Sequence, residues 1–92
     1  MNIGSSIRHF RKIKGLTQGD VEEKSGISQS YLSQIERGDK SPNMETLKTL
    51  CDSLDIPLPL LLFSSLEEED VVESKRGILT DLKPVFEDLL LS

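Results

Sequence analysis

Apolar residues recur at helical spacing along most of this 92-residue chain, and this pattern predicts an all-α protein. Ile3, Ile7 and Phe10 fall one helical turn apart, with polar and charged residues between them. We therefore expect an amphipathic first helix over residues 3–14 that ends at Gly15.

Residues 17–38 predict two short helices joined by a tight turn. Thr17 suits an N-cap, because its hydroxyl can accept from the free amides of the first turn, and Asp20 adds a negative charge near the positive helix end. Ser28 repeats the signal for the second helix. Between them, Gly26 stands where the first helix must end in a left-handed residue, a conformation that costs glycine little.

The second of these helices has an apolar face and a polar face. Leu32 and Ile35 point to one side. The other side carries small hydroxyls and amides with almost no acid, from Ser30, Ser33 and Arg37 with Gln29 and Gln34 beside them. Such side chains can approach base edges, since Gln suits adenine and Ser fits several bases. The pattern is typical of a helix-turn-helix that reads DNA.

The chain resembles the Xre family of helix-turn-helix regulators, to which Cro and the phage repressors belong. The matching residues are Ile3-Gly4, Ile7-Arg8, Arg11-Lys12, Gly15-Leu16-Thr17-Gln18, Gly26-Ile27-Ser28, Ser30-Tyr31-Leu32-Ser33-Gln34-Ile35-Glu36-Arg37-Gly38, Pro42, Glu45-Thr46-Leu47 and Leu54. The resemblance covers residues 3–62. It implies a compact five-helix, lambda-repressor-like DNA-binding domain over residues 1–64, with the helix-turn-helix at the second and third helices.

The same resemblance implies which side chains touch double-stranded DNA. The residues expected to contact bases are Gln29, Ser30, Ser33 and Gln34. The residues expected to contact phosphates are Gln18, Tyr31, Arg37, Lys40 and Asn43. For Gln18, the positive end of the second helix would act together with the side chain on one phosphate.

In the family, an arginine of the first helix pairs with a glutamate near the end of the recognition helix, and here these residues are Arg11 and Glu36. We expect a partly buried ion pair that ties the two helices together. An acid at a helix C-terminus beside DNA is disfavoured by the helix dipole and by the phosphates, which favours a cationic partner for Glu36. The alternatives are a phosphate contact or a solvated charge for Arg11, and a solvated helix end for Glu36.

The second expected helix, residues 18–25, departs from the family pattern at two positions. Glu22 replaces a small alanine that faces the recognition helix, and Gly19 lies inside the first turn. We expect the Glu22 carboxylate either to reach solvent or to find a base such as Lys24 or Lys14.

Two further helices are expected after the helix-turn-helix. Asn43 suits an N-cap for a fourth helix, whose inward stripe consists of Leu47, Leu50, Cys51 and Leu54. Residues 56–63 resemble the family's short fifth helix, in which Pro59 is tolerable in the first turn. This segment is more apolar than one face of a small core can absorb, which predicts a protein contact.

The chain ends in an acidic linker, residues 65–77, and an apolar segment, residues 78–92. We expect a helix over 81–91 that is capped by Asp81 and has Pro84 at its third position, where an amide needs no intrahelical partner. This helix either folds back on its own domain or packs against a second copy, and we favour the dimer. The residues expected at a dimer or partner contact are Leu58, Leu61, Leu62, Phe63, Leu82, Phe86, Leu89 and Leu90.

The net charge of −5 hides an asymmetry along the chain. Residues 1–43 carry seven bases against five acids, a balance of +2, whereas residues 44–92 carry four bases against eleven acids, a balance of −7. The half that contains the helix-turn-helix is therefore the one that attracts phosphates, and an acidic chain does not exclude DNA binding.

Composition argues against most other classes of function. The chain has one histidine and one cysteine, no cluster with metal-ligand spacing and no glycine-rich phosphate loop, so we expect neither an enzyme nor a bound metal or cofactor. A lone cysteine and the lack of a leader favour the cytoplasm, and the longest apolar run is too short to cross a membrane.

We expect a sequence-specific regulator of transcription, a homodimeric repressor that reads a palindromic operator in the major groove. The alternative is an antitoxin or antagonist adaptor, whose apolar C-terminal tail binds a partner protein.

Overall fold

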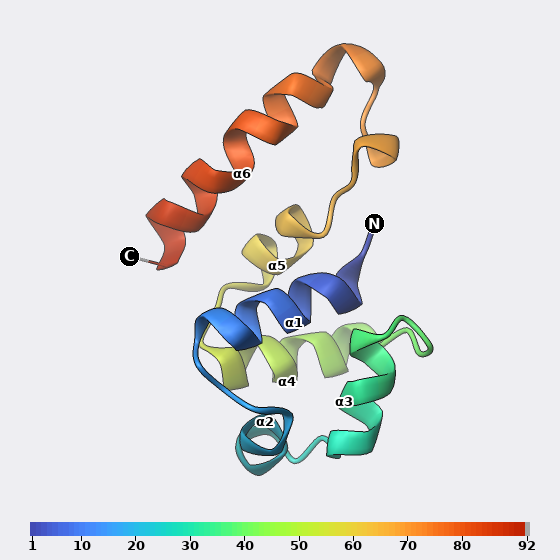
Figure 1. The fold of residues 1–92 in the computed structure, drawn as a ribbon, viewed down its shortest axis with the longest axis vertical. Helices are drawn as coiled ribbons and strands as arrows, with labels where there is room; N and C mark the ends of the chain where they lie inside the picture. The colour runs from blue at the N-terminus through green and yellow to red at the C-terminus, as the bar shows by residue number, and fades with distance from the viewer. Residues whose placement is uncertain (92) are drawn as a thin grey trace.

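The computed structural model describes residues 1–91, without the side chain of Leu90. Its elements are α1 (Ile3–Ile13), α2 (Gln18–Ser25), α3 (Gln29–Glu36), α4 (Met44–Leu54), α5 (Leu58–Ser64), the 3₁₀ turns η1 (Glu68–Asp70) and η2 (Glu73–Lys75), and α6 (Arg76–Leu91). Five helices form one compact body and α6 lies along its outer side (Figure 1). The predicted class, an all-α five-helix domain with a C-terminal helical extension, is confirmed.

The predicted ends of α2 and the predicted starts of α3 and α4 are present because their signals are local. The Thr17 hydroxyl accepts from the Asp20 amide at 3.0 Å, and the Asp20 carboxylate accepts from the Thr17 amide at 2.8 Å. These two bonds to Thr17 lower the pKa of Asp20. Gly26 ends α2 in the left-handed conformation with φ of 76°. Ser28 caps α3 and Asn43 caps α4, as expected.

The core lies where α1, α3, α4 and α5 meet, with α2 closing its lower side (Figure 1). Its fully buried side chains include Phe10 of α1, Leu32 of α3, Leu50 of α4 and Leu60 of α5. Val21 joins α2 to this core. The helix-turn-helix is therefore attached to the rest of the domain along one apolar face, which leaves its other face open.

At the start of α1 the backbone approaches α3 closely. A Cβ atom on Gly4 would lie 2.1 Å from the carbonyl oxygen of Ile35, far inside van der Waals contact. Glycine at this position allows the first turn of α1 to lie against the last turn of α3. The sequence alone shows no reason for this glycine, because the approach joins residues 31 positions apart.

The C-terminal helix begins earlier than predicted. It starts at Arg76, so the expected cap at Asp81 is wrong and Pro84 lies inside the helix. Proline removes one backbone hydrogen bond and crowds the preceding turn, which made a start shortly before Pro84 the simplest expectation. The helix nevertheless continues through this position, and one side of it packs on the domain, with Leu79 buried and Phe86 against Phe63.

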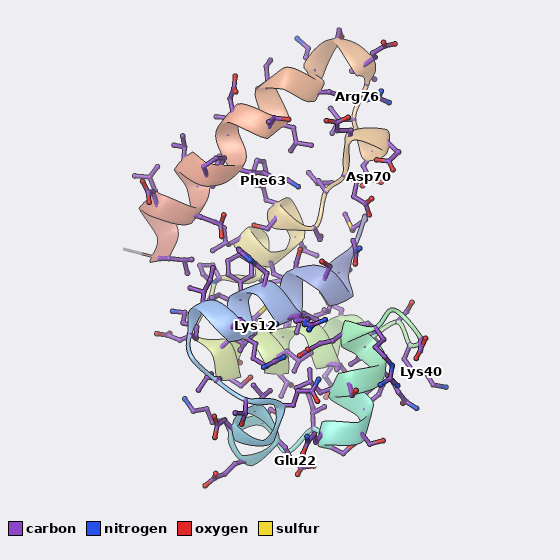
Figure 2. All side chains as sticks on the ribbon, viewed as in Figure 1. Lys12, Glu22, Lys40, Phe63, Asp70 and Arg76 are labelled. Atoms are coloured by element: carbon purple, nitrogen blue, oxygen red, sulfur yellow. The ribbon has the colours of Figure 1, made fainter. Side chains whose placement is uncertain are left out.

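The helix α6 folds back on its own chain. Phe63 of α5 and Phe86 of α6 stack with ring centroids 4.6 Å apart, and the His9 ring of α1 lies 2.7 Å from Glu87. Lys83 donates to the carbonyl of Leu66. Figure 2 shows Phe63 between α5 and α6. Of the two expected arrangements of the C-terminal helix, the one in which it folds back on its own domain is therefore present in this structure.

Several apolar residues expected at a partner contact are used inside the chain. Leu61 is fully buried, so its assignment to a partner contact is wrong. The face of α5 that carries Leu61 is covered by the rest of the domain, which a count of apolar residues along the segment could not reveal. Leu58 packs on the core, and Phe63 is partly covered by Phe86. Leu82, Phe86 and Leu89 keep exposed surface, whereas the Leu90 side chain lies outside the described part.

Within residues 1–91, no helix combines the length and the apolar composition that crossing a bilayer requires.

Candidate nucleic-acid interface

The helices α2 and α3 form a two-helix unit whose inner face belongs to the core. Val21, Leu32 and Ile35 are all buried. The opposite face of α3 is open to solvent, as the lower right of Figure 1 shows. The four residues predicted to contact bases lie on this helix: Gln29 and Ser30 are exposed, and Ser33 and Gln34 are partly exposed.

The end of α3 is organised by Arg37. Its Nη1 donates to the Ser33 hydroxyl at 2.7 Å, and its Nε donates to an Asp39 carboxylate oxygen at 3.0 Å. Residues 37 and 39 are both about 60% exposed, so this pair alone contributes little stability. These two hydrogen bonds orient the Arg37 side chain, for which a phosphate contact was predicted. The sequence did not reveal this orientation.

Below this surface, Arg11 and Glu36 form a nearly buried ion pair. Arg11 Nε and Nη2 donate to the two carboxylate oxygens of Glu36 at 2.8 and 2.9 Å, and the side chains are 11% and 3% exposed. The hydrogen bonds that Arg11 donates to Glu36 raise the pKa of Arg11. Arg11 Nη1 also donates to the carbonyl of Leu16 at 2.8 Å. One guanidinium thus joins α1, the α1–α2 connection and the end of α3.

Gln18 also takes part in this cluster. Its side-chain amide donates to Glu36 at 3.2 Å. The expected phosphate contact at Gln18 stays a prediction. For this contact, the amide would have to donate one hydrogen to the phosphate and the other to Glu36, or to break its bond to Glu36. The first turn of α2 is thereby connected to the last turn of the recognition helix.

Glu22 has a role that the sequence did not suggest. Its carboxylate accepts from the backbone amide of Gln29 at 2.7 Å, so it caps the first free amide of α3. Glu22 is exposed, so its expected access to solvent is present, but its hydrogen bond to Gln29 was not among the expected contacts. Figure 2 shows Glu22 at the end of the domain where α2 and α3 meet. Glu22 therefore forms a hydrogen bond across the turn between α2 and α3.

The remaining predicted phosphate contacts surround α3. Lys40 is exposed in the loop that follows α3, at the edge of the domain in Figure 2. Tyr31 is half-buried against the core. Asn43 uses its carbonyl oxygen to cap α4, which leaves its amide hydrogens for an incoming phosphate.

Within the described residues, no group of three or more His, Cys, Asp and Glu side chains is placed to hold a metal ion. Cys51 is buried in the core, and this burial raises the pKa of its thiol to about 11. The thiol is therefore protonated at neutral pH, as expected for a small core residue.

The fold and this surface define a DNA-binding module of the helix-turn-helix class. A family model described as helix-turn-helix matches residues 7–61, which is more than half of the chain. The chain belongs to this family, and the resemblance to Xre-type regulators is confirmed.

Known relatives are regulators of transcription. The HTH-type transcriptional regulator y4dJ of Sinorhizobium fredii is 46% identical over 59% of this chain and 70% of its own length. The immunity repressor of Bacillus phage phi105 is 30% identical over 90% of this chain and 66% of its own length. The chain spans 56 to 61% of several other regulators that it matches.

Similarity to a solved structure extends over most of the chain. The crystal structure of the clp gene regulator ClgR from Corynebacterium glutamicum matches 94% of this chain and 87% of its own, with a TM-score of 0.68 and 29% identity. These relatives are named as a transcriptional regulator, an immunity repressor and a clp gene regulator.

Proposed function

We propose that this protein is a sequence-specific repressor of transcription that places α3 in the major groove of double-stranded DNA. The observation that carries the proposal is the solvent face of α3, where uncharged hydrogen-bonding side chains stand together without an acid. Arg37 and Lys40 border this face and supply positive charge for phosphates. A regulator that binds chromosomal DNA in a bacterial cell would work in the cytoplasm.

Base reading and phosphate binding are separable by mutation. Gln29→Ala should weaken binding to a selected site by about 1–3 kcal/mol and relax its base preference, because one base-edge contact is lost. Lys40→Ala should weaken binding to all sequences alike and reduce the dependence of affinity on salt. Both are measured by fluorescence anisotropy on selected and scrambled duplexes at several salt concentrations. Unchanged affinity in both variants would contradict the docking of α3 in DNA.

We also propose that the protein binds as a homodimer on a palindromic site, because one helix-turn-helix occupies one half-site. The outer side of α6 supports a helical contact with a second copy. Ile78, Leu82, Val85 and Leu89 are 52, 38, 49 and 71% exposed. Their spacing of four, three and four residues follows the apolar pattern of a two-helix seam, on a face of α6 next to the side that packs on α5.

The double variant Leu82→Lys/Val85→Lys should shift the protein from dimer to monomer in analytical ultracentrifugation, because it places two charges in the middle of this seam. Its affinity for a two-fold symmetric site should fall, while its helix content stays unchanged by circular dichroism. Thr80→Lys is the control, since Thr80 is exposed outside the seam. A double variant that remains dimeric would show that the contact lies elsewhere.

The same exposed seam also supports the alternative of an adaptor whose tail binds another protein. The two functions differ in the mass of the purified protein. A two-chain mass together with selection of symmetric sites from random DNA favours the repressor, whereas a monomer that selects no site favours the adaptor.

A further inference from the structure

We propose that Arg37 makes Ser33 a hydrogen-bond donor toward DNA, so that the protein reads a base-edge acceptor at the position that Ser33 faces. The inference rests on the proposed function, because it requires α3 to enter the major groove. It assigns a chemical preference to one base position of the DNA. It also gives a positioning role to Arg37, for which only a contact with a DNA phosphate was expected.

The first step is the direction of the bond between these side chains. Arg37 Nη1 lies 2.7 Å from the Ser33 hydroxyl oxygen. A guanidinium can only donate, so the serine oxygen must accept. One of its two lone pairs is therefore occupied, and a positive charge lies beside it.

The second step is that the Ser33 proton is not used inside the helix. Hydroxyls in helices often donate to a carbonyl about one turn back, and this chain contains several that do. These are Ser25, Thr49, Ser53, Ser65 and Thr80, at 2.6 to 3.2 Å. Within residues 1–91, the side chain of Ser33 has only the bond that it accepts from Arg37. Its O–H is thus available to a group outside the protein.

The third step is that the loop after α3 holds Arg37 in this orientation. Asp39 accepts from Arg37 Nε at 3.0 Å, while the Asp39 amide donates to the carbonyl of Gln34 at 2.9 Å. Gly38 permits the tight reversal with φ of 82°. The guanidinium therefore bridges the loop and the reading face of α3.

These constraints select among base edges. In the major groove, guanine, adenine and thymine each present an acceptor, whereas cytosine presents only its amino group as a donor. A cytosine amino group would have to donate to a serine oxygen that already accepts from a guanidinium, and the positive charge beside this oxygen would repel the amino hydrogens. Ser33 should consequently disfavour cytosine on the strand that it faces.

The test compares affinity ratios at one base position. The base position is identified first, as the one at which Ser33→Ala changes the relative affinities for the four bases. Affinities are then measured on selected duplexes that carry each of the four bases at this position. The wild-type protein should prefer its best base over cytosine by about fivefold or more, a typical effect of one hydrogen bond. In Ser33→Ala and in Arg37→Ala the ratio should fall below about twofold.

Arg37→Ala also loses a phosphate contact, which should lower all four affinities together, so the ratio and not the affinity is the readout. Lys40→Ala is the matched control and should keep the wild-type ratio. A ratio that stays at the wild-type value in Arg37→Ala would overturn the proposal, because Ser33 would then read DNA unaided. If Gln29→Ala also left every base ratio unchanged, the failure would belong to the proposed function itself.

Discussion

Arg11→Ala should destabilise the folded protein by about 3–5 kcal/mol, the largest effect that we expect from a polar substitution in this chain. The change leaves the Glu36 carboxylate, 3% exposed, with only the amide of Gln18 as a partner. It also removes the donor to the Leu16 carbonyl. For a domain of this size the midpoint of thermal unfolding should fall by more than about 10 °C. Circular dichroism during heating measures this shift.

A second variant distinguishes the cost of leaving Glu36 without its cation from the cost of removing the whole ion pair. Arg11→Met/Glu36→Met removes both charges and keeps apolar volume, so it should be considerably more stable than Arg11→Ala. Arg8→Ala is the control for loss of a cation from α1, because Arg8 is exposed. Equal melting midpoints for Arg11→Ala and Arg8→Ala would show that the pair contributes nothing to stability.

DNA affinity should fall in Arg11→Ala even at temperatures where the variant is folded. Arg11 fixes Glu36 at the end of α3 and, through Glu36, orients the Gln18 amide of α2. Without the cation, a carboxylate whose charge is not neutralised would lie near the recognition surface and repel phosphates. Binding at low temperature, where both proteins are folded, therefore isolates this electrostatic effect.

The helix-turn-helix could be predicted from sequence because its signals are short in range. The Thr17 cap and the left-handed Gly26 each depend on residues within one turn. The Arg11 and Glu36 pair spans 25 positions, and it was accessible only through resemblance to a family. The partner of Glu22 was not accessible, because the family has a small residue there and only the fold shows that the first amide of α3 lies within reach.

The C-terminal third was harder to predict for a related reason. An interior proline is unfavourable for an isolated helix, yet α6 continues past Pro84 because packing on α5 compensates for the lost hydrogen bond. Likewise, the apolar composition of α5 predicted more apolar surface than the core could bury. In the structure α5 contacts α1, α4 and α6, and Leu61 is buried. Tertiary contacts, absent from local sequence, determine both outcomes.

Gly4→Ala should destabilise the protein by about 1–3 kcal/mol or more, although alanine favours helices. The added Cβ would lie 2.1 Å from the carbonyl oxygen of Ile35 and 3.2 Å from that of Glu36. The obstacle is backbone, and the Ile35 carbonyl already accepts from Gly38 at 3.0 Å, so relief requires α1 to move away from α3. That movement would also stretch the Arg11–Glu36 pair and weaken DNA binding.

Gly77→Ala is a matched control for this effect, because Gly77 is also the second residue of its helix and a Cβ there meets nothing within 4 Å. It should be neutral or raise stability by about 0.4–1 kcal/mol through the unfolded chain. Urea unfolding of both variants gives the comparison. If Gly4→Ala matched Gly77→Ala, the close approach of α1 to α3 would not constrain the fold, and the glycine would need another explanation. If instead Gly4→Ala lost stability and the Arg11 variant lost affinity, the contact of α1 with the end of α3 would be the point at which folding and DNA recognition are coupled.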